Sequence, residues 1–154
     1  MPRPKPKTFA PQLNVVEPKE LLTQATKLLR TASSEVDYRL IIERAYYSAY
    51  HMDSLAEEAL PIRSKVQPQK VGVHEALLQR LERPAEHLDF GLRTTRKYVG
   101  AQLRIFKAMR ELATYELKES IGIHQAEEAI LKAKDILAEC ALILQKTNTP
   151  IDRT

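Results

Sequence analysis

The sequence has very little cysteine and glycine, and each shortage excludes a class of protein. One cysteine among 154 residues rules out a disulfide framework and a cysteine-rich zinc cluster. Only 4 glycines are present and no glycine-rich phosphate-binding motif occurs, so side chains would have to hold any bound nucleotide. None of the 4 histidines follows a glutamate by three residues, which excludes a ferritin-like metal site. We therefore expect neither a metal nor a cofactor.

Long apolar runs are also missing. No segment approaches the roughly 20 consecutive apolar residues of a membrane span, and no apolar stretch of signal-peptide length stands at the N-terminus. These two absences predict a cytoplasmic protein that does not enter a membrane. The single cysteine, Cys140, lies among alanine and leucine, which predicts a small buried thiol rather than a reactive one.

Apolar residues make up 44% of the chain, and charged residues recur at helical rather than alternating spacing. This pattern predicts an all-α fold, a four-to-five-helix up-and-down bundle, with one domain over residues 17–148. Proline and capping residues set the bounds of the helices that we expect. These helices cover residues 18–31, 35–59, 74–83, 88–117 and 125–145.

Residues 1–12 have a different composition from the rest of the chain. Four prolines in this stretch prevent a regular helix, and three basic residues give it positive charge. We expect a disordered, basic, proline-rich tail. Such a tail strengthens binding to RNA or a partner, or it only solubilises the chain, and the sequence leaves both readings open.

Two residues of the 35–59 helix, Arg44 and His51, stand seven positions apart. At about 100° per residue, their side chains lie about 20° apart on one helix face, with Tyr47 and Ser48 between them. An arginine that holds a phosphate, beside an imidazole that moves a proton near neutral pH, suits chemistry on a phosphodiester. The alternative is that these residues only cover the surface of a helix.

The same helix has a second, apolar face. Small and apolar residues predict a stripe for the core, whereas Leu40 and Leu55 flank the polar strip and indicate that another helix or a second subunit covers it. Acidic residues, among them Asp53 and Glu57, lie on the remaining side, where we expect them to be solvated. The core stripe consists of Tyr38, Ile42, Ala45, Ala49, Met52 and Ala56.

The 88–117 helix is rich in basic residues. Four of them lie on or near one face and predict a track for an RNA backbone, although a net charge of only +4 equally suits a solvated basic face. Arg110 instead falls within the apolar stripe, so we expect it to pair with a carboxylate such as Glu43 or Asp37, or to join the cleft beside Arg44. Tyr115 offers a hydroxyl nearby. The track consists of Arg93, Lys97, Arg104 and Lys107.

Residues 37–51, with the sequence DYRLIIERAYYSAYH, resemble the R-A-Y-Y-x-A-[FY]-H signature helix of prokaryotic HEPN domains. Two later segments are also similar to that family. Residues 73–78 resemble its short segment with a histidine, here His74, and residues 110–115 resemble its R-x-x-A-D-Y element, with Thr114 in place of the aspartate. The resemblance extends over residues 17–148.

The resemblance implies a homodimer in which two Arg…His motifs face one cleft. It also implies a metal-independent endoribonuclease of toxin or defence type, with catalytic Arg44, His51 and Tyr47 and supporting Ser48, His74 and Tyr115. In active members of the family a polar residue follows the arginine, whereas this chain has Ala45. The alternative is therefore a non-catalytic binder of nucleotide or RNA that acts with a nucleotidyltransferase, an antitoxin or another effector. A purely structural helical adaptor is the third reading.

Overall fold

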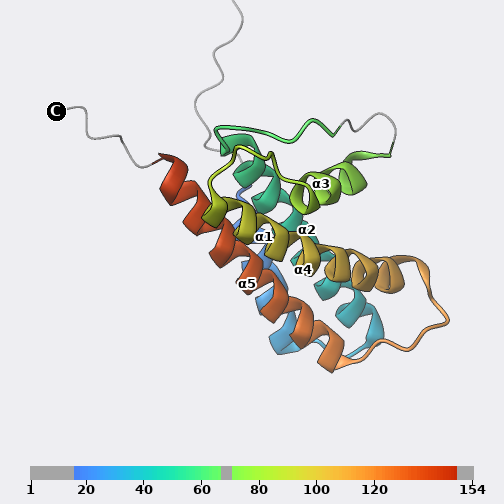
Figure 1. Cartoon of the computed structure of the whole chain (residues 1–154). Helices are drawn as coiled ribbons and strands as arrows, with labels where there is room; N and C mark the ends of the chain where they lie inside the picture. The colour runs from blue at the N-terminus through green and yellow to red at the C-terminus, as the bar shows by residue number, and fades with distance from the viewer. Residues whose placement is uncertain (1–15, 67–70, 149–154) are drawn as a thin grey trace, which may run out of the picture.

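The structure is a computed structural model that describes residues 16–66 and 71–148; the expected tail of residues 1–12 lies outside the described residues. Five helices and no strand are found in these ranges, which confirms the predicted all-α helical bundle (Figure 1). The helices are α1 (Pro18–Thr31), α2 (Glu35–Ala59), α3 (Val73–Glu82), α4 (Phe90–Tyr115) and α5 (Ile123–Asn148).

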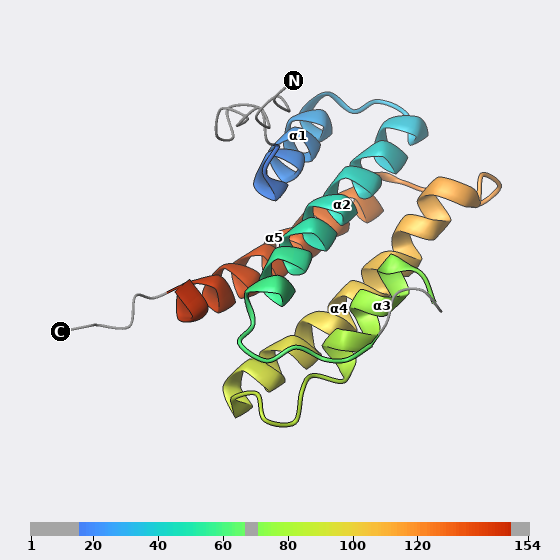
Figure 2. The same cartoon turned by 90° about the horizontal axis from the view of Figure 1, so that it is seen from above.

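Helix α2 occupies the centre of the bundle. It packs along α5 and α1 on one side and along α4 on the other, and the short α3 lies beside α4 (Figure 2). The core between these helices is made of aliphatic side chains with few aromatic ones, and the small Ala45, Ala49 and Ala56 let neighbouring helices approach α2 closely. No helix in the described ranges is long and apolar enough to cross a membrane.

The starts of α1 and α2 agree with the predicted capping residues, whereas α5 begins two residues before and ends three residues after the expected range 125–145. Pro18 opens α1, and the Ser34 side chain accepts a hydrogen bond from the backbone N–H of Asp37 at the start of α2. The Asp37 carboxylate in turn accepts from the backbone N–H of Ser33 and Ser34, so it is a capping group rather than the partner of Arg110. Helix α4 runs from Phe90 to Tyr115, two residues shorter at each end than the expected range 88–117, and Leu117 is exposed.

Helices α3 and α4 are in close contact at Gly100. A Cβ atom on Gly100 would lie 2.8 Å from the Cβ of Leu81, closer than two carbon atoms can approach. Since glycine lacks that atom, it allows the backbone of α4 to pack directly on α3. This contact fixes the position of α3, which carries His74.

Arg39 joins the first turns of α2 to the end of α4. Its guanidinium donates hydrogen bonds to the backbone carbonyls of Leu112 (3.2 Å), Ala113 (2.9 Å), Glu116 (3.2 Å) and Glu119. The last carbonyls of a helix have no partner within the helix, so a side chain from α2 supplies what the end of α4 lacks.

Asp53 and Glu57 are not solvated, which corrects the prediction of an exposed acidic side on α2. Both are buried, and Arg96 of α4, itself fully buried, donates to Asp53 Oδ1 at 2.5 Å and to Glu57 Oε2 at 2.5 Å. The thiol of Cys140 is buried, as predicted, and lies 3.5 Å from the same Asp53 oxygen; burial raises the pKa of this thiol. A carboxylate pair that is desolvated in this way needs a buried cation, which Arg96 provides.

Candidate functional site

Three helices bring together a group of tyrosine, histidine and arginine side chains that we call the aromatic cluster. Helix α2 contributes the largest share, since residues three and four positions apart share a helix face. Helix α3 contributes one histidine, and α4 contributes an arginine and a tyrosine from its last turns. The aromatic cluster consists of Tyr46, Tyr47, Tyr50, His51, His74, Arg110 and Tyr115.

Tyr46, which is buried, and His74, which is half-buried, form the base of the cluster. The Tyr46 hydroxyl lies 2.8 Å from Nδ1 of His74. Burial raises the pKa of Tyr46 well above its usual value, so its hydroxyl stays protonated. Burial also lowers the pKa of His74, and the positive charges of Arg110 and Lys107 lower it further. A neutral His74 whose Nδ1 accepts from Tyr46 keeps its proton on Nε2.

His51 is the exposed imidazole of the cluster. Its ring centroid lies 5.2 Å from that of Tyr50 and 6.0 Å from that of Tyr47, and the ring is open to solvent. Tyr50 also stacks on His74 with ring centroids 4.2 Å apart. The charge of His51 contributes to the lowered pKa of His74, so the two imidazoles are close enough to affect each other.

Arg110 is buried, as its place in the apolar stripe predicted. Its guanidinium carbon lies 5.1 Å from the ring centroid of Tyr46, 5.8 Å from that of Tyr47 and 5.7 Å from that of Tyr115. Neither Glu43 nor any other carboxylate of the described residues forms an ion pair with it, and its buried Nε atom has no hydrogen-bond partner there. Three tyrosine rings therefore stabilise a cation that keeps donor capacity for an anion.

The structure divides the predicted strip of Arg44, Tyr47, Ser48 and His51. Ser48 is fully buried and donates a hydrogen bond of 2.6 Å to the backbone carbonyl of Pro18, so it joins α2 to α1. Arg44 lines a shallow groove with Leu21, Gln24 and Lys27 of α1. Only Tyr47 and His51 of this strip belong to the aromatic cluster.

The predicted basic track on α4 is partly neutralised. Arg104 forms ion pairs with Glu75 and Glu82 of α3, and Lys107 lies 2.9 Å from a carboxylate oxygen of Glu111. Two of the four cations of the track, Arg93 and Lys97, are in none of these ion pairs. Arg93 packs over the Phe90 ring, and Lys97 is exposed. Among the basic residues of α4, Arg110 is therefore the one whose guanidinium lies against rings of the aromatic cluster.

Two residues of the cluster, Tyr46 and Tyr50, were not among the predicted site residues. Tyr46 follows the core residues Ile42 and Ala45 on its helix and reads as core, and it is indeed buried. The signal in the sequence was the spacing of Tyr46, Tyr47 and Tyr50, which places three rings on one side of a helix.

No group of three or more histidine, cysteine, aspartate or glutamate side chains suited to a metal ion occurs among the residues that the structure describes. No family model, no curated protein and no solved structure matches this chain.

Proposed function

We propose that this protein is a metal-independent endoribonuclease of HEPN type that acts in the cytoplasm in toxin or defence systems, with the aromatic cluster as its active site. The observation that carries the proposal is the position of His51, an exposed imidazole beside Tyr47, whose ring in turn contacts the Arg110 guanidinium. A titratable imidazole and a permanent cation, each close to the Tyr47 ring, are the groups that cleavage of a phosphodiester requires.

In this mechanism His51 accepts the proton of a ribose 2′-hydroxyl. The 2′-oxygen attacks the adjacent phosphorus, the bond from phosphorus to the 5′-oxygen breaks, and the protonated His51 donates the proton to that oxygen. Arg110 stabilises the negative charge that develops on the phosphate, and Tyr47 orients it. The products are a 2′,3′-cyclic phosphate and a 5′-hydroxyl. Arg44 would contact RNA that continues along α2 toward α1.

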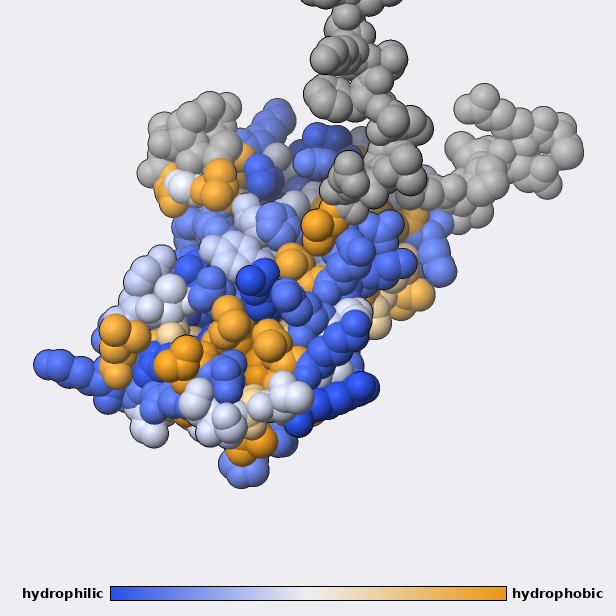
Figure 3. Space-filling model, turned by 180° about the vertical axis from the view of Figure 1, so that it is seen from behind, coloured by the Kyte–Doolittle hydropathy of each residue, from blue (hydrophilic) through white to orange (hydrophobic). Residues whose placement is uncertain are grey.

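We further propose that two chains form a homodimer through the exposed face of α2. Leu40 and Leu55, which flank the cluster residues of that face, are 36% and 44% exposed. Apolar side chains also gather into a patch on the rear face of the molecule (Figure 3). Apolar residues at both ends of a polar strip suit an interface that leaves a wet cleft in its middle.

A second candidate function is a non-catalytic protein that binds RNA or a nucleotide and acts with a nucleotidyltransferase, an antitoxin or another effector. The observation that favours it is the position of Ala45, the residue after Arg44, which is fully buried in the core. No polar side chain from that position reaches a phosphate. In this case the cluster binds the ligand through stacking and charge alone.

The test is cleavage of a labelled mixed-sequence RNA in EDTA by three forms of the full chain. The wild type and His51→Ala are compared with His124→Ala, a control that removes an exposed histidine at the start of α5. All three should show equal helicity by circular dichroism. We expect cleavage by the wild type and His124→Ala only. Binding without cleavage by all three would favour the second candidate, and equal cleavage by all three would exclude His51 as the catalyst.

A further inference from the structure

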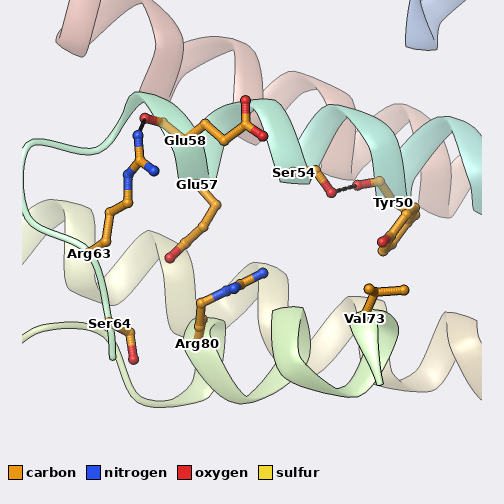
Figure 4. A pocket seen from close by; sticks show the side chains of 8 residues that line it. All are labelled: Tyr50, Ser54, Glu57, Glu58, Arg63, Ser64, Val73 and Arg80. Atoms are coloured by element: carbon orange, nitrogen blue, oxygen red, sulfur yellow. Dashed lines mark hydrogen bonds between the residues drawn. The ribbon is translucent and has the colours of Figure 1, made fainter. Parts of the chain in front are cut away.

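A cavity of about 330 Å³ lies next to the aromatic cluster, between α2, the segment that follows α2, and α3. Figure 4 shows Glu57 extending from α2 and Arg80 extending from α3 into the same space, with Tyr50 at one end. Arg63 also lines the cavity, but it turns away and donates to the backbone carbonyl of Glu58. The volume is large enough for a nucleobase and too small for a folded segment of chain.

Glu57 brings an unused acceptor to this cavity. Its Oε2 atom is held by the buried Arg96, whereas its Oε1 atom is buried and has no hydrogen-bond partner among the described residues. Glu57 as a whole is only 5% exposed. Since a buried carboxylate oxygen without a donor costs free energy, the cavity favours a ligand that supplies one N–H group at this point.

Arg80 brings an unused donor from the opposite wall. Its Nε atom is buried and has no hydrogen-bond partner in the described part of the chain. An anion in the cavity would be attracted by Arg80 but repelled by Glu57. A cation would be attracted by Glu57 but repelled by Arg80. A neutral group that carries a donor and an acceptor on one edge satisfies both walls.

We propose that this cavity binds a single unstacked nucleobase that carries an amino group, namely adenine, guanine or cytosine. The amino group donates to Glu57 Oε1, and an adjacent ring nitrogen or carbonyl oxygen accepts from Arg80. Uracil has no amino group. Its N3–H lies between two carbonyl oxygens, one of which would be placed against the Glu57 carboxylate.

Tyr50 connects the cavity to the aromatic cluster. The same side chain lines the cavity and stacks on His74 with ring centroids 4.2 Å apart. A base in the cavity would therefore belong to a nucleotide next to the phosphate that contacts the cluster. This inference rests on the proposed function in one respect, because it assigns to the same RNA a base preference at the position beside the cleaved bond.

The test uses hexamers of 2′-O-methyl RNA, which cannot be cleaved at the 2′-oxygen, with uracil at every position except one central variable base. Affinities are measured by fluorescence anisotropy for the full-length wild type, Arg80→Leu and Arg83→Leu. Arg83 is an exposed arginine at the end of the same helix and serves as the matched control. We expect the wild type to bind the hexamers with adenine, guanine or cytosine about tenfold more tightly than the one with uracil. Arg80→Leu should lose this preference and Arg83→Leu should keep it.

Equal affinity of the wild type for the four hexamers, or no binding of any, would overturn the proposal, as would an unchanged preference in Arg80→Leu. If Arg80→Leu fails to reach wild-type helicity, Arg80→Gln replaces it, because glutamine keeps a polar side chain without the guanidinium. Cleavage of ordinary RNA is measured in parallel and separates the two hypotheses. A base preference without cleavage removes the ribonuclease function and keeps the base pocket, whereas cleavage without a base preference does the opposite.

Discussion

The hydroxyl of Tyr46 and Nδ1 of His74, which lie 2.8 Å apart, form a direct polar contact between α2 and α3. The two residues are 28 positions apart in the chain. With Tyr46 protonated and the pKa of His74 lowered, the hydroxyl donates and the ring nitrogen accepts. One partly buried hydrogen bond thus sets both the position and the tautomer of the His74 imidazole.

The stability of the protein should depend on His74 below neutral pH. Burial and the nearby Arg110 and Lys107 lower the pKa of His74. Near pH 6.5 the unfolded chain therefore binds a proton at this histidine that the folded chain does not bind. The free energy of unfolding should therefore fall as the pH drops from 7.5 through 6.5, by at most about 1.4 kcal/mol per pH unit from this group. Urea unfolding of the wild type and His74→Gln at pH 7.5, 6.5 and 5.5 measures how the free energy of unfolding depends on pH. Identical slopes in the two proteins would contradict the prediction.

Replacing Arg96 by methionine should destabilise the protein strongly. The change leaves Asp53 and Glu57 buried without their cation, which costs about 3–5 kcal/mol in comparable cases. Chemical unfolding followed by circular dichroism measures the loss. Arg104→Met is the control, since Arg104 is partly exposed and its ion pairs should contribute only about 0–1 kcal/mol. A similar loss of stability in both variants would show that the buried ion pairs of Arg96 stabilise the protein no more than the exposed ones of Arg104.

Ser48→Ala should reduce the stability of the protein without affecting RNA binding or cleavage. The change removes the hydrogen bond to the Pro18 carbonyl between α2 and α1, which is worth about 1 kcal/mol, and leaves the aromatic cluster intact. The midpoint of urea unfolding and RNA cleavage or binding are measured on the same preparation. A loss of RNA activity at unchanged stability would instead place Ser48 in the functional site.

Arg110→Lys should weaken the interaction with RNA although the charge is retained. Lysine lacks the flat guanidinium that lies over the rings of Tyr46, Tyr47 and Tyr115, and it offers a point charge instead of a planar set of donors. We expect a loss of about tenfold in RNA affinity or cleavage rate. Arg93→Lys is the control, because Arg93 lies outside the cluster. Equal effects of the two changes would show that only the charge matters.

The starts of the first two helices were predictable from the sequence because they depend on local chemistry. Pro18 and Ser34 act within one turn of their own positions, so the expected and observed starts of α1 and α2 agree. The buried place of Arg110 was also predictable, since periodicity alone puts it in the apolar stripe. The HEPN resemblance stays a prediction, and so do the ribonuclease activity and the homodimer.

The partners of buried polar residues were not predictable in the same way. Asp53 and Glu57 lie four positions apart, which is the spacing of an exposed acidic face, and their partner Arg96 is about 40 positions away on another helix. Ser48 reads as a polar surface residue until α1 is seen to cover it. These contacts depend on how the helices pack against one another, and the residue pattern within a single helix gives no information about that packing.

Arg39 also affects how well the aromatic cluster is ordered before a ligand binds. Because it holds the final carbonyls of α4 from the side of α2, the last turn of α4 does not fray unless α2 moves as well. Tyr115 lies in that turn, and Arg110 lies just before it. The positions of Arg110 and Tyr115 relative to Tyr47 are thus set before any ligand binds. An RNA strand would lose conformational entropy on binding, but the protein would lose little.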